Sequence, residues 1–223
     1  MKHLTSFIIL SSLSFSAFAL DLGLSASSLK VKLYKFAVST SPLCTNLITV
    51  IDNGATPVDT QLLGGANLGS GTLANGTYPC VVLEMDDAIK YIPAANSTSG
   101  NCLTSAETTR TLCHNGDSSE LVDGTVTSCV TGAVDKVAMY ISTATSGSNG
   151  DGFNKPTSIG DTLHGSNLPS ALVVAGDTSA TMMVSTAGQL CDYNAAGCDG
   201  SAGGGGVVAG GCHLEGAAIT FED

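Results

Sequence analysis

Tryptophan is absent from this 223-residue chain, and aromatic residues of all kinds make up only 5% of it. Clefts that bind polysaccharides usually rely on exposed aromatic platforms, so this scarcity argues against such a cleft. Basic residues are also few, because eight Lys and Arg stand against 19 Asp and Glu for a formal net charge of −11. An acidic surface repels phosphate backbones and anionic lipid, so we expect no nucleic-acid partner and no docking on anionic membranes. The acidity is best explained as keeping an exported protein soluble.

The sequence motifs of several enzyme classes are missing as well. No Gly-x-Ser-x-Gly motif occurs, and Gly203 to Gly206 is not followed by the lysine and Ser/Thr of a phosphate-binding loop. A serine hydrolase would need His114, His164 or His213 as its base. His114 and His213 each adjoin a cysteine, and only His164 lies in a long polar loop, where a catalytic base is expected. We therefore expect no catalytic residues, and an exported hydrolase with a site near His164 is the alternative.

Metal ligands do not occur at the usual spacing. The residue types suit zinc at Cys113, His114, Cys191, Cys198, Cys212 and His213. However, six residues separate Cys191 from Cys198, and structural zinc sites place two to four between their cysteines. Calcium could use oxygen atoms of Asn149, Asp151, Asn154 and Asp161, or of Asp192, Asn194 and Asp199, but neither run matches a calcium-loop pattern. We interpret both runs as solvated turns, and we expect no metal and no cofactor.

The first 19 residues have the pattern of a bacterial secretory leader. Lys2 and His3 provide a basic start, an apolar run follows from Phe7 to Phe18, and Ala17-Phe18-Ala19 is a small-x-small cleavage site. The apolar run is short and rich in serine, whereas a membrane span takes about 20 apolar residues. We predict export without a membrane span, with the mature chain beginning at Leu20. Periplasm, cell surface and extracellular medium are all open as destinations.

All eight cysteines lie beyond this leader. They are Cys44, Cys80, Cys102, Cys113, Cys129, Cys191, Cys198 and Cys212. An even count in an exported chain predicts disulfides, up to four, with no free thiol. Eight cysteines allow 105 pairings, so the connectivity is open. We predict one bridge, Cys102–Cys113, because it closes a short loop and would contribute on the order of 3 kcal/mol.

Short apolar runs separated by turn residues predict an all-β fold. Leu29, Val31 and Leu33 alternate with Lys30, Lys32 and Tyr34, which indicates a strand from Ser28 to Thr40 with one wet face. Asn75-Gly76 is a turn signal before the buried strand Val81 to Met85. Further strands are expected at 47–51, 58–63, 126–130, 137–143, 171–175, 180–185 and 217–221.

Two stretches are ambiguous between helix and strand. Residues 88–92 fit a helical spacing, but Pro93 follows so soon that we favour a strand. Thr104-Ser105-Ala106-Glu107 has the form of a capping box and predicts a single helical turn. The expected fold is therefore a disulfide-stapled β-sandwich with long polar loops and little helix.

We predict one domain over residues 20–223, with a subdivision near 144–170 as an alternative. Ala144 to Ser170 is a long polar stretch, and its large apolar residues Phe153, Ile159, Leu163 and Leu168 are expected to anchor it. A loop of this length in a compact domain is either functional or mobile.

Gly76-Thr77-Tyr78-Pro79-Cys80-Val81-Val82-Leu83 resembles a motif of prealbumin-like β-sandwich domains of bacterial surfaces, in which a Gly-x-Tyr turn precedes a core strand. The resemblance covers residues 29–93. It implies a structural or adhesive module and carries over no catalytic residue. We therefore predict an exported, non-catalytic module that is structural or binds a protein or surface ligand at or near the cell surface. The sequence leaves the partner and the oligomeric state open.

Overall fold

The computed structural model describes residues 22–66, 68, 71–130, 132–146, 152–176, 181–192, 211–214 and 216–222. The predicted leader and its cleavage site lie outside these residues. The described part of the chain is all-β and contains no helix, which confirms the predicted fold class. It accordingly holds no helix long and apolar enough to cross a membrane. The single domain over residues 20–223 stays a prediction, as does its alternative, a subdivision near 144–170.

The described strands are β1 (Leu22–Leu24), β2 (Ala26–Ser39), β3 (Ile48–Asp52), β4 (Val58–Gln61), β5 (Gly76–Tyr78), β6 (Cys80–Asp86), β7 (Ala88–Pro93), β8 (Thr108–Thr111), β9 (Ser118–Glu120), β10 (Val126–Ser128), β11 (Lys136–Ser142), β12 (Ser166–Asn167), β13 (Leu172–Val174), β14 (Thr181–Ser185), β15 (Leu190–Asp192), β16 (Cys212–Leu214) and β17 (Ala218–Glu222). Every strand that the sequence predicts is present, with its ends within two residues of the expected ones.

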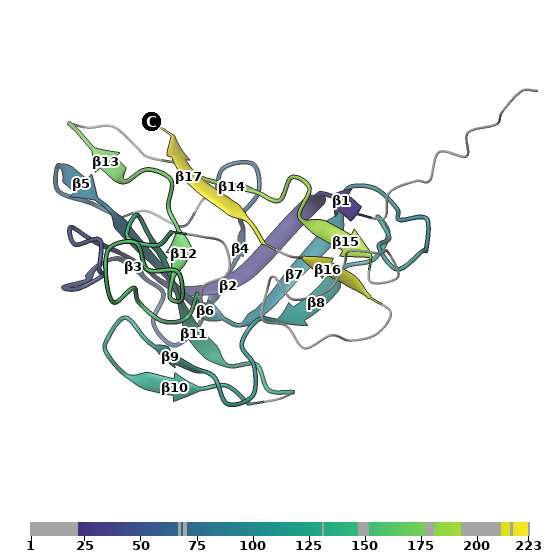
Figure 1. The fold of residues 1–223 in the computed structure, drawn as a ribbon, viewed down its shortest axis with the longest axis horizontal. Coiled ribbons are helices and arrows are strands. Elements are labelled where there is room, and N and C mark those ends of the chain that lie inside the picture. Colours follow the sequence, from purple (N-terminus) through teal and green to yellow (C-terminus); the bar gives the residue numbers. More distant parts are fainter. Residues whose placement is uncertain are drawn as a thin grey trace, which may run out of the picture.

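The main sheet is built around β2, which Figure 1 shows as the long purple strand. β6 runs into β7 through Asp87 alone, and both pair antiparallel with β2 along one edge. β3 and β4 pair with the same stretch of β2 and therefore occupy its other edge. Beyond β6 lies β11, which also pairs with the short parallel strand β12, and beyond β7 lies β8. A 14-residue strand with both edges paired is the centre of the sheet.

Alternation along β2 sends its side chains to two different environments, as predicted. Leu29, Val31 and Leu33 are buried, whereas Lys32 is exposed and Tyr34 partly exposed. The pairing with β6 shifts register between Leu33 and Lys35, so the strand carries a bulge there. Lys35 is consequently paired with Glu84 of β6, on the face opposite the core. We call this face, which carries Lys32, Tyr34, Lys35 and Glu84, the outer face.

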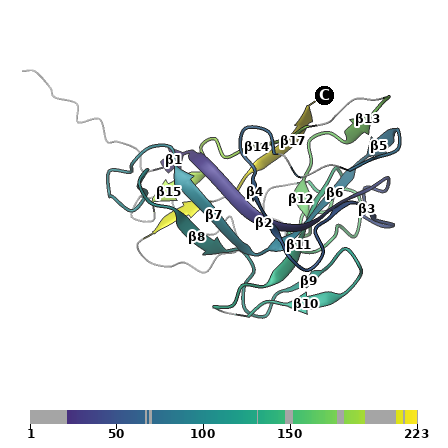
Figure 2. The same ribbon diagram turned by 180° about the vertical axis from the view of Figure 1, so that it is seen from behind.

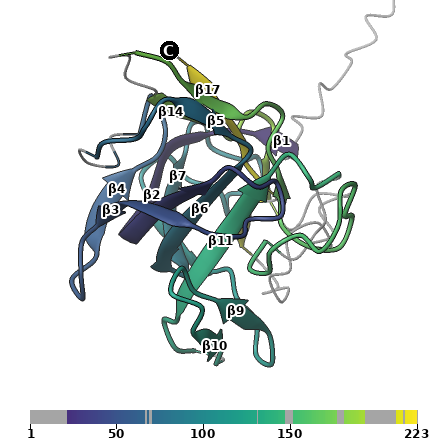
Figure 3. The same cartoon turned by 90° about the vertical axis from the view of Figure 1, so that its left-hand side faces the viewer.

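A second layer covers the core side of the main sheet. It consists of small sheets, namely β14–β17, β13–β5 and β1–β15–β16. Figure 3 shows β14, β17 and β5 above β2, β6 and β11. Leu33, Leu83 and Met85 of the main sheet belong to one buried cluster with Met182 and Ile219 of the second layer. This two-layer packing is the arrangement of a β-sandwich. The β9–β10 hairpin lies at one margin of it (Figure 2).

Three disulfides join distant segments among the described residues: Cys44–Cys80, Cys102–Cys212 and Cys113–Cys129. Cys191 is also disulfide-bonded, and Cys198 lies outside the described residues. These bridges are consistent with an oxidising, exported environment.

The predicted bridge Cys102–Cys113 is wrong. The extended strand β8 separates the two cysteines, and four strand residues alone span about 13 Å. Cysteines whose Cα atoms are more than about 7 Å apart cannot be bridged. The Cα atoms of the actual pairs are 4.7 Å apart for Cys102–Cys212 and 5.7 Å apart for Cys113–Cys129.

Two further local predictions are wrong. The capping-box residues Thr104 and Ser105 form a turn without a helix. The side chain of Glu107, which would have capped that helix, instead forms an ion pair with Lys30. Gly76 lies in β5 and is not among the residues with positive φ, so Asn75-Gly76 does not form the expected tight turn. The glycines of Asp52-Asn53-Gly54 and Asp123-Gly124 do adopt positive φ, of 67° and 85°.

Candidate binding surface

The three histidines of the described chain are held by three different partners. His114 Nδ1 lies 3.3 Å from Asp117 Oδ2, and His213 Nδ1 lies 2.7 Å from a guanidinium nitrogen of Arg110. His164 Nδ1 lies 3.1 Å from Asp161 Oδ2. Each histidine therefore belongs to its own local contact, in agreement with the scattered positions in the sequence.

Asp161 organises the loop that contains His164. Its carboxylate accepts hydrogen bonds from the backbone N–H groups of Thr157 at 2.8 Å, Leu163 at 2.8 Å and His164 at 3.0 Å. The hydroxyl of Thr157 donates a further bond at 2.8 Å. These donors, above all the backbone N–H of Thr157, hold the pKa of Asp161 far below its usual range. The carboxylate stays ionised and fixes two successive turns of the loop.

The same loop is tied to the scaffold. The backbone N–H groups of Gly160 and Asp161 donate to the backbone oxygen of residue 144, and the backbone oxygen of Asp161 accepts from residue 146. Phe153 and Leu168, which flank this segment, are buried in the core. These two residues anchor the loop as predicted. Ile159 and Leu163 do not, because they are 71% and 69% exposed. They stand two residues before and two after Asp161, so the fixed loop presents two aliphatic side chains to solvent. We call residues 157–164 the Asp161 loop.

His164 and Asp161 have the geometry of a base and its orienting acid, but the described residues supply no third member. The hydroxyl next to this pair belongs to Thr157, and it donates to the aspartate instead of contacting the histidine ring. Within the described residues, the ring of His164 has no bonded serine, threonine or cysteine. A hydrolase needs its nucleophile within hydrogen-bond reach of the base.

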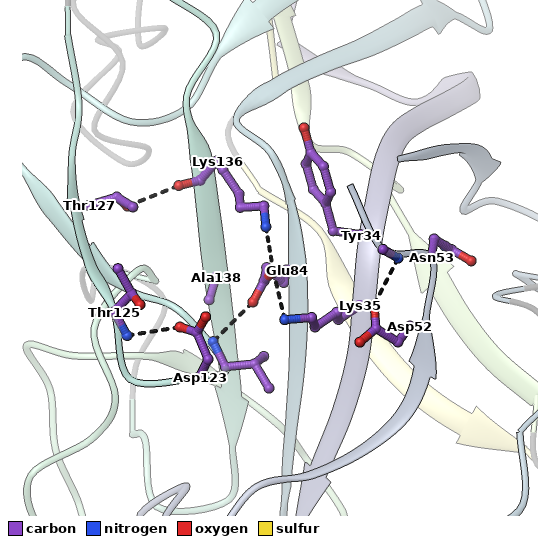
Figure 4. A network of polar contacts seen from close by, with 12 residues as sticks. Tyr34, Lys35, Asp52, Asn53, Glu84, Asp123, Thr125, Thr127, Lys136 and Ala138 are labelled. Atoms are coloured by element: carbon purple, nitrogen blue, oxygen red, sulfur yellow. Dashed lines mark hydrogen bonds and ion pairs between the residues drawn. The ribbon is translucent and has the colours of Figure 1, made fainter. Parts of the chain in front are cut away.

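A second polar arrangement lies on the outer face and is shown in Figure 4. The carboxylate of Glu84 is fully buried between Lys136, at 3.0 Å, and Lys35, at 3.5 Å. Its other oxygen accepts the backbone N–H of Val122 at 3.0 Å. A buried carboxylate is stable only when it is paired and hydrogen-bonded, and this one is both.

The Glu84 network continues through Tyr34 to Asp86. The ammonium group of Lys136 lies 4.4 Å from the centre of the Tyr34 ring, within cation–π range. The Tyr34 hydroxyl donates to Asp86 Oδ1 at 2.9 Å. Burial, followed by this bond to Asp86, raises the pKa of Tyr34 to about 12, so its phenol remains a donor at neutral pH.

Asp86 also lines a pocket of about 160 Å³ on the outer face, which we call the lysine pocket. Three lysines from β2 and β7 contribute to it, namely Lys30, Lys32 and Lys90, together with Asp59 of β4. Its remaining lining residues are Val31, Ala88, Thr109 and Val134. The central strand and both its neighbours thus supply the walls.

The residues considered for metals lie apart in the structure. The sulfur atoms of Cys113, Cys191 and Cys212 are in disulfides and are not available as thiolates. Asp161 belongs to its own loop, whereas Asp192 accepts hydrogen bonds from the side chain and backbone of Asn101. The remaining calcium candidates divide between Asn154, whose amide donates to Ser118 O, and residues outside the described ranges: Asn149, Asp151, Asn194 and Asp199. No cluster of three acidic, histidine or cysteine ligands occurs among the described residues.

The Glu84 network and the lysine pocket were not predicted from the sequence. A charged residue inside the apolar run Val81–Met85 was the available signal, because a carboxylate in a buried strand requires a cationic partner. The pocket had a weaker signal in the lysines of β2 and β7, whose spacing does not show that they converge.

Comparison with known proteins gives no relative for this fold or these sites: no protein-family model, curated protein or solved structure matches the chain significantly. The resemblance of residues 29–93 to prealbumin-like surface domains stays a prediction.

Proposed function

We propose that this protein is an exported, non-catalytic binding module that acts at or near the bacterial cell surface, and that the Asp161 loop contacts its partner. The observation that carries the proposal is the pair Ile159 and Leu163, about 70% exposed on a loop fixed by a buried carboxylate. Exposed aliphatic residues on a rigid loop are suited to binding, because little conformational entropy is lost when the partner docks.

Burial of these two side chains would contribute usefully to affinity. Complete burial of one leucine or isoleucine contributes about 1.5–3 kcal/mol, so covering both exposed portions contributes about 2–4 kcal/mol. That range corresponds to an affinity gain of about 30-fold to 1000-fold. The disulfides and the two-layer core support the proposal, because they hold the loop's anchors in place.

The test is binding of the fluorescently labelled mature protein to the cells that export it, measured by flow cytometry. Ile159→Ser with Leu163→Ser should reduce cell binding at least tenfold. Val126→Ser with Val130→Ser is the matched control, because these valines are 65% and 56% exposed elsewhere, and it should change binding less than twofold. Equal losses in both double variants, or no cell binding by the wild type, would overturn the proposal.

The contact between His164 and Asp161 favours one alternative, an exported hydrolase. Assays with ester, peptide and glycoside substrates should show no turnover by the wild type. Turnover that His164→Gln abolishes while His114→Gln retains it, with both variants folded, would establish the hydrolase and contradict the binding module.

A further inference from the structure

Cationic side chains are scarce in this chain, yet most of them share one face. Of the eight Lys and Arg, Lys2 belongs to the predicted leader, and five of the other seven lie on the outer face of the main sheet. These five line the lysine pocket or hold Glu84: Lys30, Lys32, Lys35, Lys90 and Lys136. Although the net charge of the chain is −11, most of its positively charged side chains therefore lie in one region.

Two lysines of the pocket already hold a carboxylate. Glu107 lies between them, with Oε2 2.9 Å from the ammonium nitrogen of Lys30 and Oε1 3.8 Å from that of Lys90. Glu107 comes from the turn before β8 and not from the pocket wall, and its side chain is 34% exposed. Lys30 and Lys90 can therefore bind a carboxylate that comes from a segment outside the pocket lining.

Lys32, the third lysine of the pocket, does not bind a carboxylate in this way. Lys32 is exposed and takes part in no ion pair with the described residues. Of the two acidic residues that line the pocket, Asp86 accepts the Tyr34 hydroxyl, and Asp59 is the register partner of Lys32 on β4. Once Glu107 turns outward, three ammonium groups face two carboxylates, one of which is already hydrogen-bonded.

We propose that the lysine pocket binds the carboxylates of an external acidic polymer, such as a polyuronate, and that Glu107 occupies this position when the polymer is absent. This site is separate from the Asp161 loop and does not depend on the function proposed for it. Recognition is by the local lysine cluster and acts against the net charge of −11, which repels polyanions from the rest of the surface. The scarcity of aromatic residues does not oppose binding by charge.

Exchange of Glu107 for an external carboxylate is energetically feasible. Exposed ion pairs contribute little to stability, so turning Glu107 into solvent costs little. By the same argument, a single external carboxylate gains little. A polymer gains more, because linked carboxylates bind at a high effective concentration once the first is bound. Lys30 and Lys32 are two residues apart on β2, which places their Cα atoms about 7 Å apart for successive contacts.

The experiment measures binding of the mature, disulfide-bonded protein by isothermal titration calorimetry at low salt. The probes are polygalacturonate, its monomer galacturonate, and uncharged dextran. We expect measurable binding of polygalacturonate, binding of the monomer at least 100-fold weaker, and none of dextran. Binding of polygalacturonate should weaken as salt is raised, because screening reduces attraction between exposed charges.

Substitutions in the lysine pocket and at a control ion pair test whether the polymer binds in the pocket. Glu107→Gln removes the internal competitor and should bind polygalacturonate at least threefold more tightly, whereas Lys30→Gln with Lys90→Gln should bind at least tenfold more weakly. Glu120→Gln is the matched control for Glu107→Gln, and Lys155→Gln removes one lysine charge from the same ion pair elsewhere; each should change affinity less than twofold. Absence of binding by both wild type and Glu107→Gln overturns the proposal. So does an equal effect of the control variants, which would indicate attraction to net charge alone.

Discussion

Lys136 and Glu84 lie on neighbouring strands, with the ammonium nitrogen of the lysine 3.0 Å from a carboxylate that is fully buried. The side chain of Lys136 is 34% exposed, whereas that of Glu84 has no exposure. The two residues therefore respond differently when the other is removed. Lys136 without its partner can turn to water, but Glu84 without its lysines would leave an unpaired carboxyl group buried in the sheet.

This asymmetry predicts unequal effects of removing the two sides of the pair. Lys35→Met with Lys136→Met should destabilise the protein by about 3–5 kcal/mol, the usual cost of leaving a buried charge without its partner. Glu84→Gln should cost less, because both lysines can reach solvent. Urea unfolding at pH 7 measures both values. A larger loss for Glu84→Gln would contradict the prediction.

Asp87 predicts a dependence of stability on pH. Its side chain is buried, and its carboxylate accepts the backbone N–H of Asp135. Burial raises the pKa of Asp87, opposed by backbone hydrogen bonds from Asp135 and Cys113 and reinforced by the charges of Asp135 and Asp86. The protonated form is therefore favoured in the folded state. Its contribution is complete below the unfolded pKa of about 3.9 and is lost as pH rises through the folded pKa.

Asp87→Asn removes this titration. The stability of the variant relative to wild type should rise as pH increases from about 3.9, and should level off above the folded pKa of Asp87. Thermal unfolding of both proteins from pH 3 to pH 8 provides the comparison. A stability difference that is constant over this range would show that Asp87 has an ordinary pKa in the folded protein.

The close packing around Gly71 predicts that this position does not tolerate a larger residue. A Cβ atom at this position would lie 2.4 Å from Val50 Cγ1 and 2.5 Å from the backbone oxygen of Val50 in β3. Backbone cannot move aside cheaply, so Gly71→Ala should destabilise by about 1–3 kcal/mol, the usual cost of overpacking. Gly76→Ala is the matched control, because its Cβ would meet only the Tyr78 ring at 3.5 Å. Similar melting temperatures for the two variants would refute the expected clash.

The disulfides predict a definite peptide map. Digestion without reductant should release peptides joined as Cys44–Cys80, Cys102–Cys212 and Cys113–Cys129, and thiol titration under denaturant should find no free cysteine. Replacing Cys102 and Cys212 by alanine should cost about 2–5 kcal/mol, because their bridge closes a separation of 110 residues. Recovery of a peptide joined as Cys102–Cys113 would contradict the fold around β8.

Local alternation made most of this fold predictable. In β2, residues 29–34 alternate apolar with polar or aromatic residues, and the structure places the two sets on opposite faces. Other local signals predicted the strands at 88–92 and 126–130, namely the early Pro93 for the first and a short apolar run for the second. These signals lie within a few residues of each other, so they do not depend on the rest of the chain.

What could not be predicted depends on contacts between distant residues. Thr104-Ser105-Ala106-Glu107 would cap a helix in isolation, but Glu107 is drawn to Lys30, 77 residues away in the chain. Cys212, the partner of Cys102, lies in β16, and the spacing of the two cysteines in the sequence does not indicate that they lie close together. The lysine pocket likewise exists only because β4, β2 and β7 lie side by side.

The central position of β2 also bears on the order in which the parts of the fold and its disulfides form. Each described strand that pairs with β2 ends before residue 94, and the bridge Cys44–Cys80 lies within the same segment. That half of the main sheet can therefore form before the rest of the chain has been synthesised. Cys102 must wait for residue 212, so its oxidation should come last and should determine how soon protease resistance appears. Trapping thiols at successive times after synthesis would reveal this sequence, and early closure of Cys102–Cys212 would exclude it.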